Sequence, residues 1–250
     1  MVRIELDDVS VHFPIYNAGN RSLRSRLIDI ATGGRISADR NGRMVVCALE
    51  NIDLRLQDGD RIGVVGHNGA GKSTLLRLLS GVYWPTGGNV KINGTIGSLI
   101  DLSLGMEHEA TGRENIYIRG GLLGMRSSEI RRALGEIIEF SGLGDFIDMP
   151  LRTYSAGMQL RLAFSVSTQL RPNILLMDEW LSVGDEEFRD KARGRLESLM
   201  REAHVLVLAT HSRDLLLRIC NKAVWLEHGR VRMVSDARTI SAAYFETSPE

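Results

Sequence analysis

The chain has 250 residues, 43% of them apolar, and its 31 basic residues balance its 31 acidic ones. This length and apolar content suit one large folded domain, or a core with an insertion, and exclude a disordered protein. A net charge of zero excludes an overall basic field that would recruit nucleic acid or an anionic membrane. Cys47 and Cys220 lie far apart without metal-ligand spacing, so we expect reduced, buried thiols.

Two alternating stretches near the N-terminus, from Val2 and from Met44 to Leu56, predict strands of a small antiparallel layer. An insertion over residues 16–42 separates them and is rich in glycine, asparagine, serine and arginine. Its middle places three apolar side chains on one helical face, Leu23, Leu27 and Ile30. Such a short basic amphipathic helix fits a membrane surface or a membrane partner, and it fits packing on its own domain equally well.

No stretch has the layout of a signal peptide, and none reaches the run of about twenty apolar residues that a membrane-spanning helix needs. We therefore expect a chain that is soluble by itself. If it works at a membrane, it must use the spans of another protein.

Residues Gly66 to Thr74 read GHNGAGKST and predict a phosphate-binding loop. A buried strand, RIGVV, precedes the loop, and a helical pattern follows it, which is the context that the motif requires. Glycines let backbone N–H groups approach an anion, Lys72 can reach the terminal phosphates, and Ser73 is placed to ligate Mg²⁺. We assign nine residues to nucleotide binding: Gly66, His67, Asn68, Gly69, Ala70, Gly71, Lys72, Ser73 and Thr74.

The stretch ILLMDEW from Ile174 predicts a buried strand whose carboxyl end meets solvent, where ligands bind in parallel sheets. We expect Asp178 to hold Mg²⁺. Glu179 should project differently, because successive strand residues alternate, and polarise a water for attack. The alternative is that both carboxylates are only solvated charges at a strand end.

Between these motifs the pattern becomes helical, from Gly112, from Ser127 and from Gly157. Ser127 and Ser128 are candidates for capping the second of these helices. Strands and helices then alternate again after Ile174. This order predicts an α/β fold, with a parallel-sheet core, an antiparallel β layer and an inserted helical block.

The motifs and their order resemble the nucleotide-binding subunit of an ABC transporter, with Walker A at Gly66–Thr74, the signature at Tyr154–Met158 and Walker B at Ile174–Glu179. The phrases YSAGMQLRLAF, WLSVGDEEF, TGRENIYIRGGLLGM and VWLEHGRV most resemble exporters of bacterial polysaccharides such as O-antigen, capsule and teichoic acid. The resemblance covers nearly the whole chain. It implies a P-loop NTPase core of RecA type, with ATP and Mg²⁺ as cofactors.

On this resemblance we expect one ABC ATPase domain, with its core in residues 1–97 and 171–250 and a helical subdomain in residues 98–170. The signature residues Tyr154, Ser155, Ala156, Gly157 and Met158 are expected to contact the nucleotide on the opposite subunit. Ser155 and Gly157 correspond to residues that meet the γ-phosphate. Ser155 also fits a helix N-cap, and both roles are compatible because helix N-termini bind phosphate.

Further residues follow from the same resemblance. His211 matches the switch histidine that contacts the γ-phosphate and the attacking water, so Glu179, His211 and Lys72 form the expected catalytic set. Asp101 stands nearest the position of a glutamine that senses Mg²⁺ and the membrane partner, and an aspartate there can serve the metal.

Two expectations concern the rim of the site. Phe13, with Tyr16 as second candidate, should stack on the adenine, a contact that suits any base. Residues 182–185 match the loop that touches the opposite subunit, with Asp185 as the expected contact.

The resemblance implies an ATPase that exports a lipid-linked polysaccharide, of O-antigen or capsule type, across the bacterial inner membrane. We expect a homodimer at the cytoplasmic face, bound to a separate permease that selects the substrate. Because the chain stops soon after DARTISAAYFE, we expect no carbohydrate-binding domain, and we expect no nucleic-acid partner.

Two alternatives belong to other classes. A soluble ABC-type ATPase acting on nucleic acid or ribosomes would call for a long coiled-coil insertion, two cassettes or a basic stripe, and the sequence has none of these. A module that binds nucleotide without turnover conflicts with the intact Lys72, Asp178, Glu179 and His211, while Asp101 and Met158 depart from the usual pattern.

Overall fold

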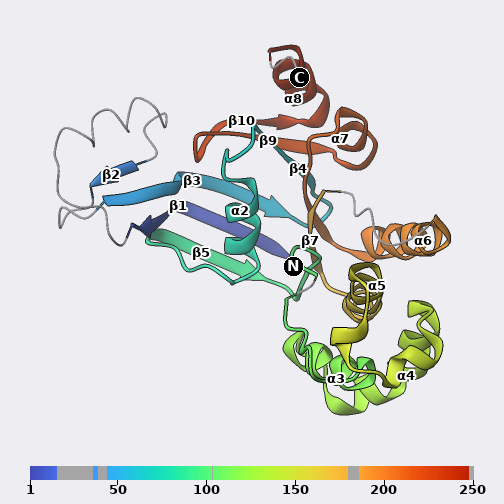
Figure 1. Ribbon diagram of the computed structural model, residues 1–250. Helices are drawn as coiled ribbons and strands as arrows, with labels where there is room; N and C mark the ends of the chain where they lie inside the picture. The colour runs from blue at the N-terminus through green and yellow to red at the C-terminus, as the bar shows by residue number, and fades with distance from the viewer. Residues whose placement is uncertain (16–35, 39–43, 103, 180–185, 248–250) are drawn as a thin grey trace. The chain divides into compact units, whose positions relative to one another are not determined.

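The computed structural model describes residues 1–15, 36–38, 44–102, 104–179 and 186–247 (Figure 1). Tyr16, most of the insertion at 16–42 and the expected interface loop with Asp185 therefore lie outside the described residues. The chain forms two compact units: the first comprises residues 1–94, 176–179 and 204–250, and the second comprises residues 95–175 and 180–203.

The first unit contains the antiparallel layer that the alternating N-terminal stretches predicted. Its strands are β1 (Arg3–Pro14), β2 (Ile36–Ala38), β3 (Met44–Gln57) and β5 (Gly87–Asn93), in the order β2-β3-β1-β5. Every neighbouring pair runs antiparallel. One face is buried by alternate apolar residues, such as Ile4 and Leu6 on β1, which explains why this stretch folds as a half-buried sheet.

A second sheet contains the parallel strands of the core. Its strands are β4 (Arg61–Val65), β6 (Ile96–Ser98), β7 (Ile174–Asp178), β8 (Val205–Ala209), β9 (Lys222–Glu227) and β10 (Arg230–Asp236). They follow the order β10-β9-β4-β8-β7-β6, and β4 lies parallel to both β8 and β9. All five residues of β8 are buried, as expected for a strand covered on both faces.

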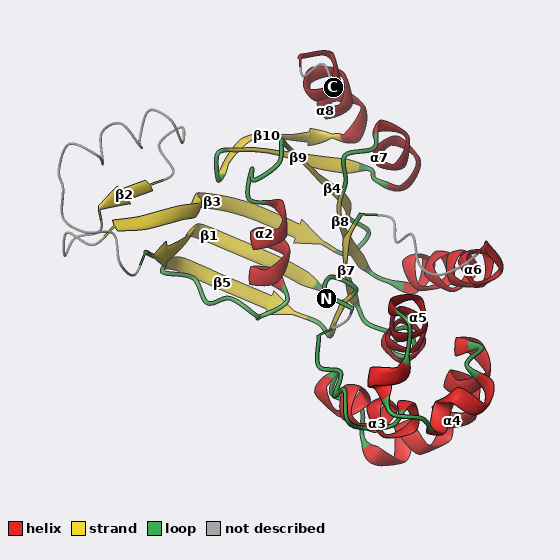
Figure 2. Cartoon of the chain, in the orientation of Figure 1, coloured by secondary structure: helices red, strands yellow, loops and turns green. Residues whose placement is uncertain are grey.

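Three helices complete the described part of the first unit: α2 (Lys72–Leu79), α7 (Arg213–Ile219) and α8 (Ala237–Thr247). Helix α2 contacts β8, and α8 contacts β9 and β10. Because β4 leads into α2, the carboxyl edge of the parallel sheet and the start of α2 meet at the glycine-rich loop (Figure 2). This is the α/β architecture that the sequence predicted.

The second unit is mostly helical. Its elements after β6 are α3 (Gly112–Leu122), α4 (Ser127–Ser141), the short 3₁₀ helices η1 (Gly144–Asp148) and η2 (Leu151–Thr153), α5 (Ala156–Ser167) and α6 (Glu186–Glu202). The helices α3, α4 and α5 share an apolar core that includes Ile116, Ile137 and Leu162. The unit extends beyond residues 98–170 and includes α6. The limits of the helical subdomain expected from the sequence stay a prediction.

One local expectation is wrong. Neither Ser127 nor Ser128 caps α4, because the helix already includes Ser127 and its N-cap is Arg126. The backbone N–H of Arg126 donates to the Glu129 carboxylate at 2.7 Å, so the acidic residue at the third helical position closes this end. Among the described residues, no helix is both long and apolar enough to cross a membrane.

Candidate active site

The loop between β4 and α2 has a backbone that requires glycine. Gly66, Gly69 and Gly71 have φ angles of 153°, 78° and 112°. A Cβ on Gly66 would lie 2.3 Å from the carbonyl oxygen of Leu226, and one on Gly71 would lie 2.9 Å from that of Ala48. Both strain and steric overlap therefore exclude larger residues, and the loop can turn its N–H groups toward an anion.

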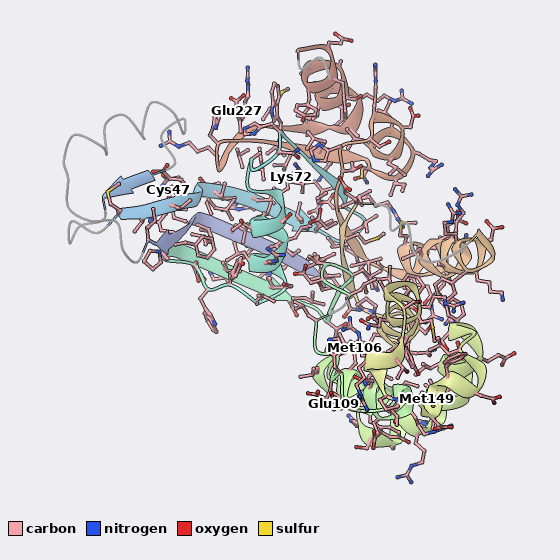
Figure 3. All side chains as sticks on the ribbon, viewed as in Figure 1. Cys47, Lys72, Met106, Glu109, Met149 and Glu227 are labelled. Atoms are coloured by element: carbon pink, nitrogen blue, oxygen red, sulfur yellow. The ribbon has the colours of Figure 1, made fainter. Side chains whose placement is uncertain are left out.

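The side chain of Lys72 folds back onto this loop and bonds to its backbone. Its side chain is drawn at the start of α2 in Figure 3, and the residue is only 8% exposed. The Nζ atom donates to the carbonyl oxygens of Gly66, at 2.8 Å, and His67, at 3.2 Å. Burial lowers the pKa of Lys72, while the carboxylates of Asp178 and Glu179 act against that shift. The ammonium group thus lies within the loop and next to both acids.

Ser73 and Asp178 come together across the parallel sheet. The Ser73 hydroxyl donates to Oδ2 of Asp178 at 2.8 Å, although the two residues are 105 positions apart. Asp178 is the last residue of β7, which places its carboxylate at the carboxyl edge of the sheet. A hydroxyl beside a carboxylate is a set of hard oxygen donors, which is the chemistry that Mg²⁺ accepts together with substrate phosphates. These two residues therefore fit a magnesium ion.

Glu179 lies just outside β7 in a left-handed conformation, with φ 59°. Its N–H donates to the carbonyl of Ala209 at 2.8 Å, which joins it to the end of β8. The direction of its side chain is therefore set by this turn, and the alternation along a strand that we expected is wrong. The carboxylate is 61% exposed, so it can reach a water molecule.

His211 follows β8 and lies beside Glu179, with 3.9 Å between Nε2 of the imidazole and Oε1 of the carboxylate. Burial lowers the pKa of His211, the charge of Lys72 lowers it further, and the carboxylates of Glu179 and Asp178 oppose the shift. The imidazole is consequently held toward its neutral form, in which one ring nitrogen donates and the other accepts.

The turn between β9 and β10 braces the glycine-rich loop, and sequence reasoning missed this role. Gly229 donates its N–H to the carbonyl of Ala70 at 2.9 Å and accepts from the N–H of Glu50 at 2.8 Å. The ring of His228 lies 4.7 Å from that of His67. A positive φ at His228 and at Gly229 makes this a tight hairpin, and the dipeptide HG between two strands was the available signal.

Phe13, the candidate for stacking on a base, is half-buried near the end of β1. Its ring packs edge-on against Tyr83, with centroids 5.1 Å apart and planes at 71°. That contact fixes the ring orientation, and stacking on adenine stays a prediction. Tyr16, the second candidate, lies outside the described residues.

The signature stretch forms the beginning of α5 in the second unit. Ser155 is the N-cap, and its hydroxyl accepts from the N–H of Met158 at 3.2 Å. Ala156 and Gly157 are exposed, and a Cβ on Gly157 would meet nothing closer than 3.9 Å. The backbone here is therefore ordinary, as expected from an alanine at position 156, and the first turn of the helix is open.

Tyr154 and Met158 are engaged inside the second unit. Tyr154 is 6% exposed, and its hydroxyl donates to the carbonyl of Phe146 at 2.5 Å. Burial raises the pKa of this hydroxyl. Met158 packs against the same apolar core. The side chain of Tyr154 is thus committed to the core, which leaves its backbone as the part that could meet a ligand.

Asp101 lies in an exposed bend after β6, where its carbonyl accepts from the N–H of Leu104 at 3.1 Å. It belongs to the second unit, whereas Ser73 and Asp178 belong to the first. Its assignment as a magnesium ligand stays a prediction.

Comparison with known proteins identifies the family of this chain. Residues 49–182 match the family model described as ABC transporter. The chain belongs to the ABC transporter family. It is an ATPase of this family, and the glycine-rich loop and the carboxylates described above lie within the matched region. ATP is therefore the nucleotide.

Among curated relatives of this ABC chain, the O-antigen export system ATP-binding protein RfbE of Yersinia enterocolitica is 42% identical over 92% of the chain and 97% of that protein. The teichoic acids export ATP-binding protein TagH of Listeria innocua is 38% identical over 80% of the chain and 59% of that protein. A solved ATP-binding cassette, dimeric and bound to ADP and Pi, superposes with a TM-score of 0.67 at 19% identity, covering 94% and 99% of the two chains. That likeness establishes the fold.

Proposed function

We propose that this protein is the ATP-hydrolysing subunit of an ABC transporter that exports a lipid-linked polysaccharide of O-antigen or capsule type. The observation that carries the proposal is the 42% identity to an O-antigen export ATP-binding protein over 97% of that protein's length. Similarity over the full length of a relative, beyond the shared motifs, favours a shared task over the family's general chemistry. No nucleic-acid partner is part of this proposal.

The geometry of the first unit supports specific roles in hydrolysis. The N–H groups of the glycine-rich loop and the Lys72 ammonium would hold the terminal phosphates, and Ser73 and Asp178 would hold Mg²⁺. When bound, the ion neutralises charge on the phosphate oxygens. Glu179 would polarise the attacking water as general base. A neutral His211 beside it could hold that water or the γ-phosphate through its ring nitrogens.

The second unit supports a homodimer as the working form. Its exposed helix N-terminus at Ser155–Gly157 offers N–H groups suited to phosphate, and we propose that it meets ATP bound by the partner copy. Two copies would then face head to tail with two nucleotides between them. Charge-assisted hydrogen bonds to each γ-phosphate, about 1.5–3 kcal/mol apiece, would close this interface, and hydrolysis would remove them.

The transport step requires a membrane partner. We propose a separate permease at the bacterial inner membrane, with this chain on its cytoplasmic face. Phosphate-dependent closing and opening of the dimer would drive the permease, because the γ-phosphate binds the two states with different affinity. Substrate choice would then lie in the permease.

A complementation experiment tests the proposal. Deleting the gene should remove the polysaccharide from the cell surface and leave its lipid-linked form inside the cell. Expression of the wild-type chain should restore export, and the Lys72→Ala variant, expressed to the same level, should not. Affinity purification of the wild-type chain should recover a permease. Unchanged surface polysaccharide in the deletion strain would overturn the assignment to export, and recovery of nucleic acid in place of a permease would favour the other class.

A further inference from the structure

Two histidines meet between the glycine-rich loop and the tip of the β9–β10 hairpin. His67 is the second residue of the loop, and His228 directly follows Glu227, which Figure 3 labels at the end of β9. Both histidines belong to the first unit. Their ring centroids lie 4.7 Å apart, and the ring planes are tilted by 54°. Two segments that are distant in the chain thus bring two imidazoles to one place, and the roles proposed for hydrolysis use neither ring.

The ring of His67 has one nitrogen engaged and one left over. Nδ1 donates to the carbonyl oxygen of Asn68 at 2.8 Å, because a carbonyl oxygen can only accept. In the neutral imidazole this bond fixes the tautomer, so Nε2 carries a lone pair. Nε2 is shielded from solvent and has no hydrogen-bond partner among the described residues. Because a buried acceptor without a partner is unfavourable, this nitrogen suits a cation that comes from outside the chain.

The hairpin holds His228 in a fixed place beside the loop. The N–H of Gly229 donates to the carbonyl of Ala70 at 2.9 Å, and the carbonyl of Gly229 accepts from the N–H of Glu50 at 2.8 Å. Arg230 donates from Nε and Nη2 to the carboxylate of Glu50, at 3.1 and 2.9 Å. The two rings are therefore brought together by backbone bonds on either side of them, which is how a preorganised ligand pair is built.

Two imidazoles at this separation suit one class of ligand. Imidazole nitrogens bind transition-metal dications such as Zn²⁺, Ni²⁺ and Cu²⁺, whereas Mg²⁺ prefers oxygen. Zn–N bonds of about 2.0–2.1 Å and a tetrahedral angle place the ring centroids of two ligands about 5 Å apart. The observed 4.7 Å is close to this value. A carbonyl on the second ring nitrogen, as Asn68 provides for His67, is also the usual support of a metal-binding histidine.

Solvent reaches the pair from the side of His228, which is exposed. An ion can therefore enter there and keep water on its remaining positions. The part of the chain that the structure describes contains no group of three His, Cys, Asp or Glu side chains arranged to hold a metal. A site built from the pair thus has two protein ligands, and its ion should exchange more readily than one in a closed, four-ligand zinc site.

We propose that His67 and His228 bind a transition-metal dication of the zinc type, at a site separate from the proposed magnesium ligands Ser73 and Asp178. The bound ion joins the hairpin to the glycine-rich loop and adds positive charge beside it. This site goes beyond the proposed function and does not depend on it, because neither hydrolysis nor export enters the argument. Its direct consequence is that zinc stabilises the folded chain, as does any ligand that binds only the folded state.

A zinc titration of the untagged full chain tests the proposal. It uses ZnCl₂ and isothermal calorimetry, without ATP, because the phosphates of ATP bind zinc themselves. His228→Asn removes one imidazole, and asparagine tolerates the left-handed backbone at this position. This variant should bind Zn²⁺ at least about tenfold more weakly than the wild-type chain, since even the loss of a group that only supports a ligand has such an effect. His67→Gln removes the other ring and should weaken binding in the same way, which keeps the test valid if the first variant does not fold.

Two matched variants locate the ion. His204 is another exposed histidine of the first unit, with its Nδ1 2.9 Å from Oδ1 of Asp58. His204→Asn should keep the wild-type affinity for zinc. His211→Gln removes the imidazole beside Glu179, a second place where zinc could bind. It should leave intact the binding event that His228→Asn removes.

Thermal unfolding gives a second measurement. ZnCl₂ should raise the Tm of the wild-type chain and leave the Tm of His228→Asn unchanged, whereas MgCl₂ should not distinguish the two chains. Two outcomes would overturn the proposal. One is a folded His228→Asn variant with wild-type zinc affinity and a wild-type rise in Tm. The other is zinc binding that is lost in His211→Gln and kept in His228→Asn, which would place the ion beside Glu179.

Discussion

The phosphate loop of the first unit and the signature turn of the second unit differ in how complete they are within one chain. In the first unit, Lys72 bonds to loop carbonyls, Ser73 bonds to Asp178, and Glu179 lies beside His211. In the second unit, the start of α5 at Ala156 and Gly157 is exposed, and the Ser155 hydroxyl accepts from the N–H of Met158 in the same turn.

This difference indicates that the phosphate loop and the signature turn contribute different parts of the site. The chain brings Lys72, the Ser73–Asp178 pair and the Glu179–His211 pair together by itself, around glycines whose backbone angles other residues avoid, and it presents the signature turn as an exposed helix end. Such an end suits a ligand supplied from outside the chain, because its N–H groups need no rearrangement to accept a phosphate. The comparison therefore favours two half-sites that are completed by a second copy.

Replacing the base should give the largest effect. In Glu179→Gln the amide cannot accept a proton from water, so kcat should fall by about 10²–10⁴-fold while ATP still binds. ATP should then hold the variant as a dimer, detected by light scattering on a sizing column. Turnover close to wild type would place the base elsewhere and remove the chemistry from the first unit.

Matched glycine substitutions test the contrast between the two regions directly. In Gly66→Ala the new Cβ would lie 2.3 Å from the Leu226 carbonyl, so the loop must move. ATP affinity should fall at least about tenfold, and stability should fall by about 1–3 kcal/mol. In Gly157→Ala the space is open, and the helix should gain up to about 1 kcal/mol.

Isothermal titration calorimetry and urea denaturation of the separate variants would measure both quantities. If the two substitutions gave equal losses of ATP affinity in the isolated chain, the difference between a tight loop and an open helix end would not hold.

The pH dependence of turnover should report on His211. Burial and the charge of Lys72 lower its pKa from the ordinary value of 6.5, so the neutral form persists below pH 6.5 and is lost only as the pH falls through the lowered value. The acid limb of a kcat/KM–pH profile, which reports ionisations of the free enzyme, should have its midpoint below 6.5. His211→Gln cannot titrate and should lose that limb. A midpoint above 6.5 that depends on His211 would contradict the neutral assignment.

The smallest effect concerns Tyr154. Tyr154→Phe leaves the carbonyl of Phe146 without its buried partner, so the free energy of unfolding should fall by about 1 kcal/mol with kcat unchanged. Urea denaturation and a steady-state ATPase assay measure the two quantities. A lower kcat at unchanged stability would show that the hydroxyl acts in catalysis and not in the core.

The sequence predicted the features that are written in short, contiguous motifs. The strand–loop–helix at Gly66–Thr74, the strand ending at Asp178 and the N-cap at Ser155 all depend on residue types that suit their local backbone. The antiparallel layer and the helical insertion could also be predicted, because the spacing of their apolar residues is a local pattern.

Features that depend on tertiary contacts were out of reach. The hydrogen bond from Arg195 of α6 to Glu136 of α4 joins residues that are 59 positions apart, and nothing in either local pattern links them. The brace of Gly229 against Ala70 and the left-handed turn at Glu179 are likewise set by neighbouring strands. At α4 the sequence was misleading, because Ser127 and Ser128 suggested a cap. The N-cap is Arg126, one residue before Ser127, and its N–H donates to the carboxylate of Glu129.

A mixing experiment tests most directly whether two chains share each site. Lys72→Ala disables the phosphate loop, and Gly157→Asp places a negative charge at the open helix end; each variant alone should be inactive. Their mixed dimer contains one intact pair of half-sites. An equimolar mixture should therefore recover about a quarter of the wild-type rate, since half the dimers are mixed and each has one working site. No recovery in a mixture shown to contain mixed dimers would contradict the account.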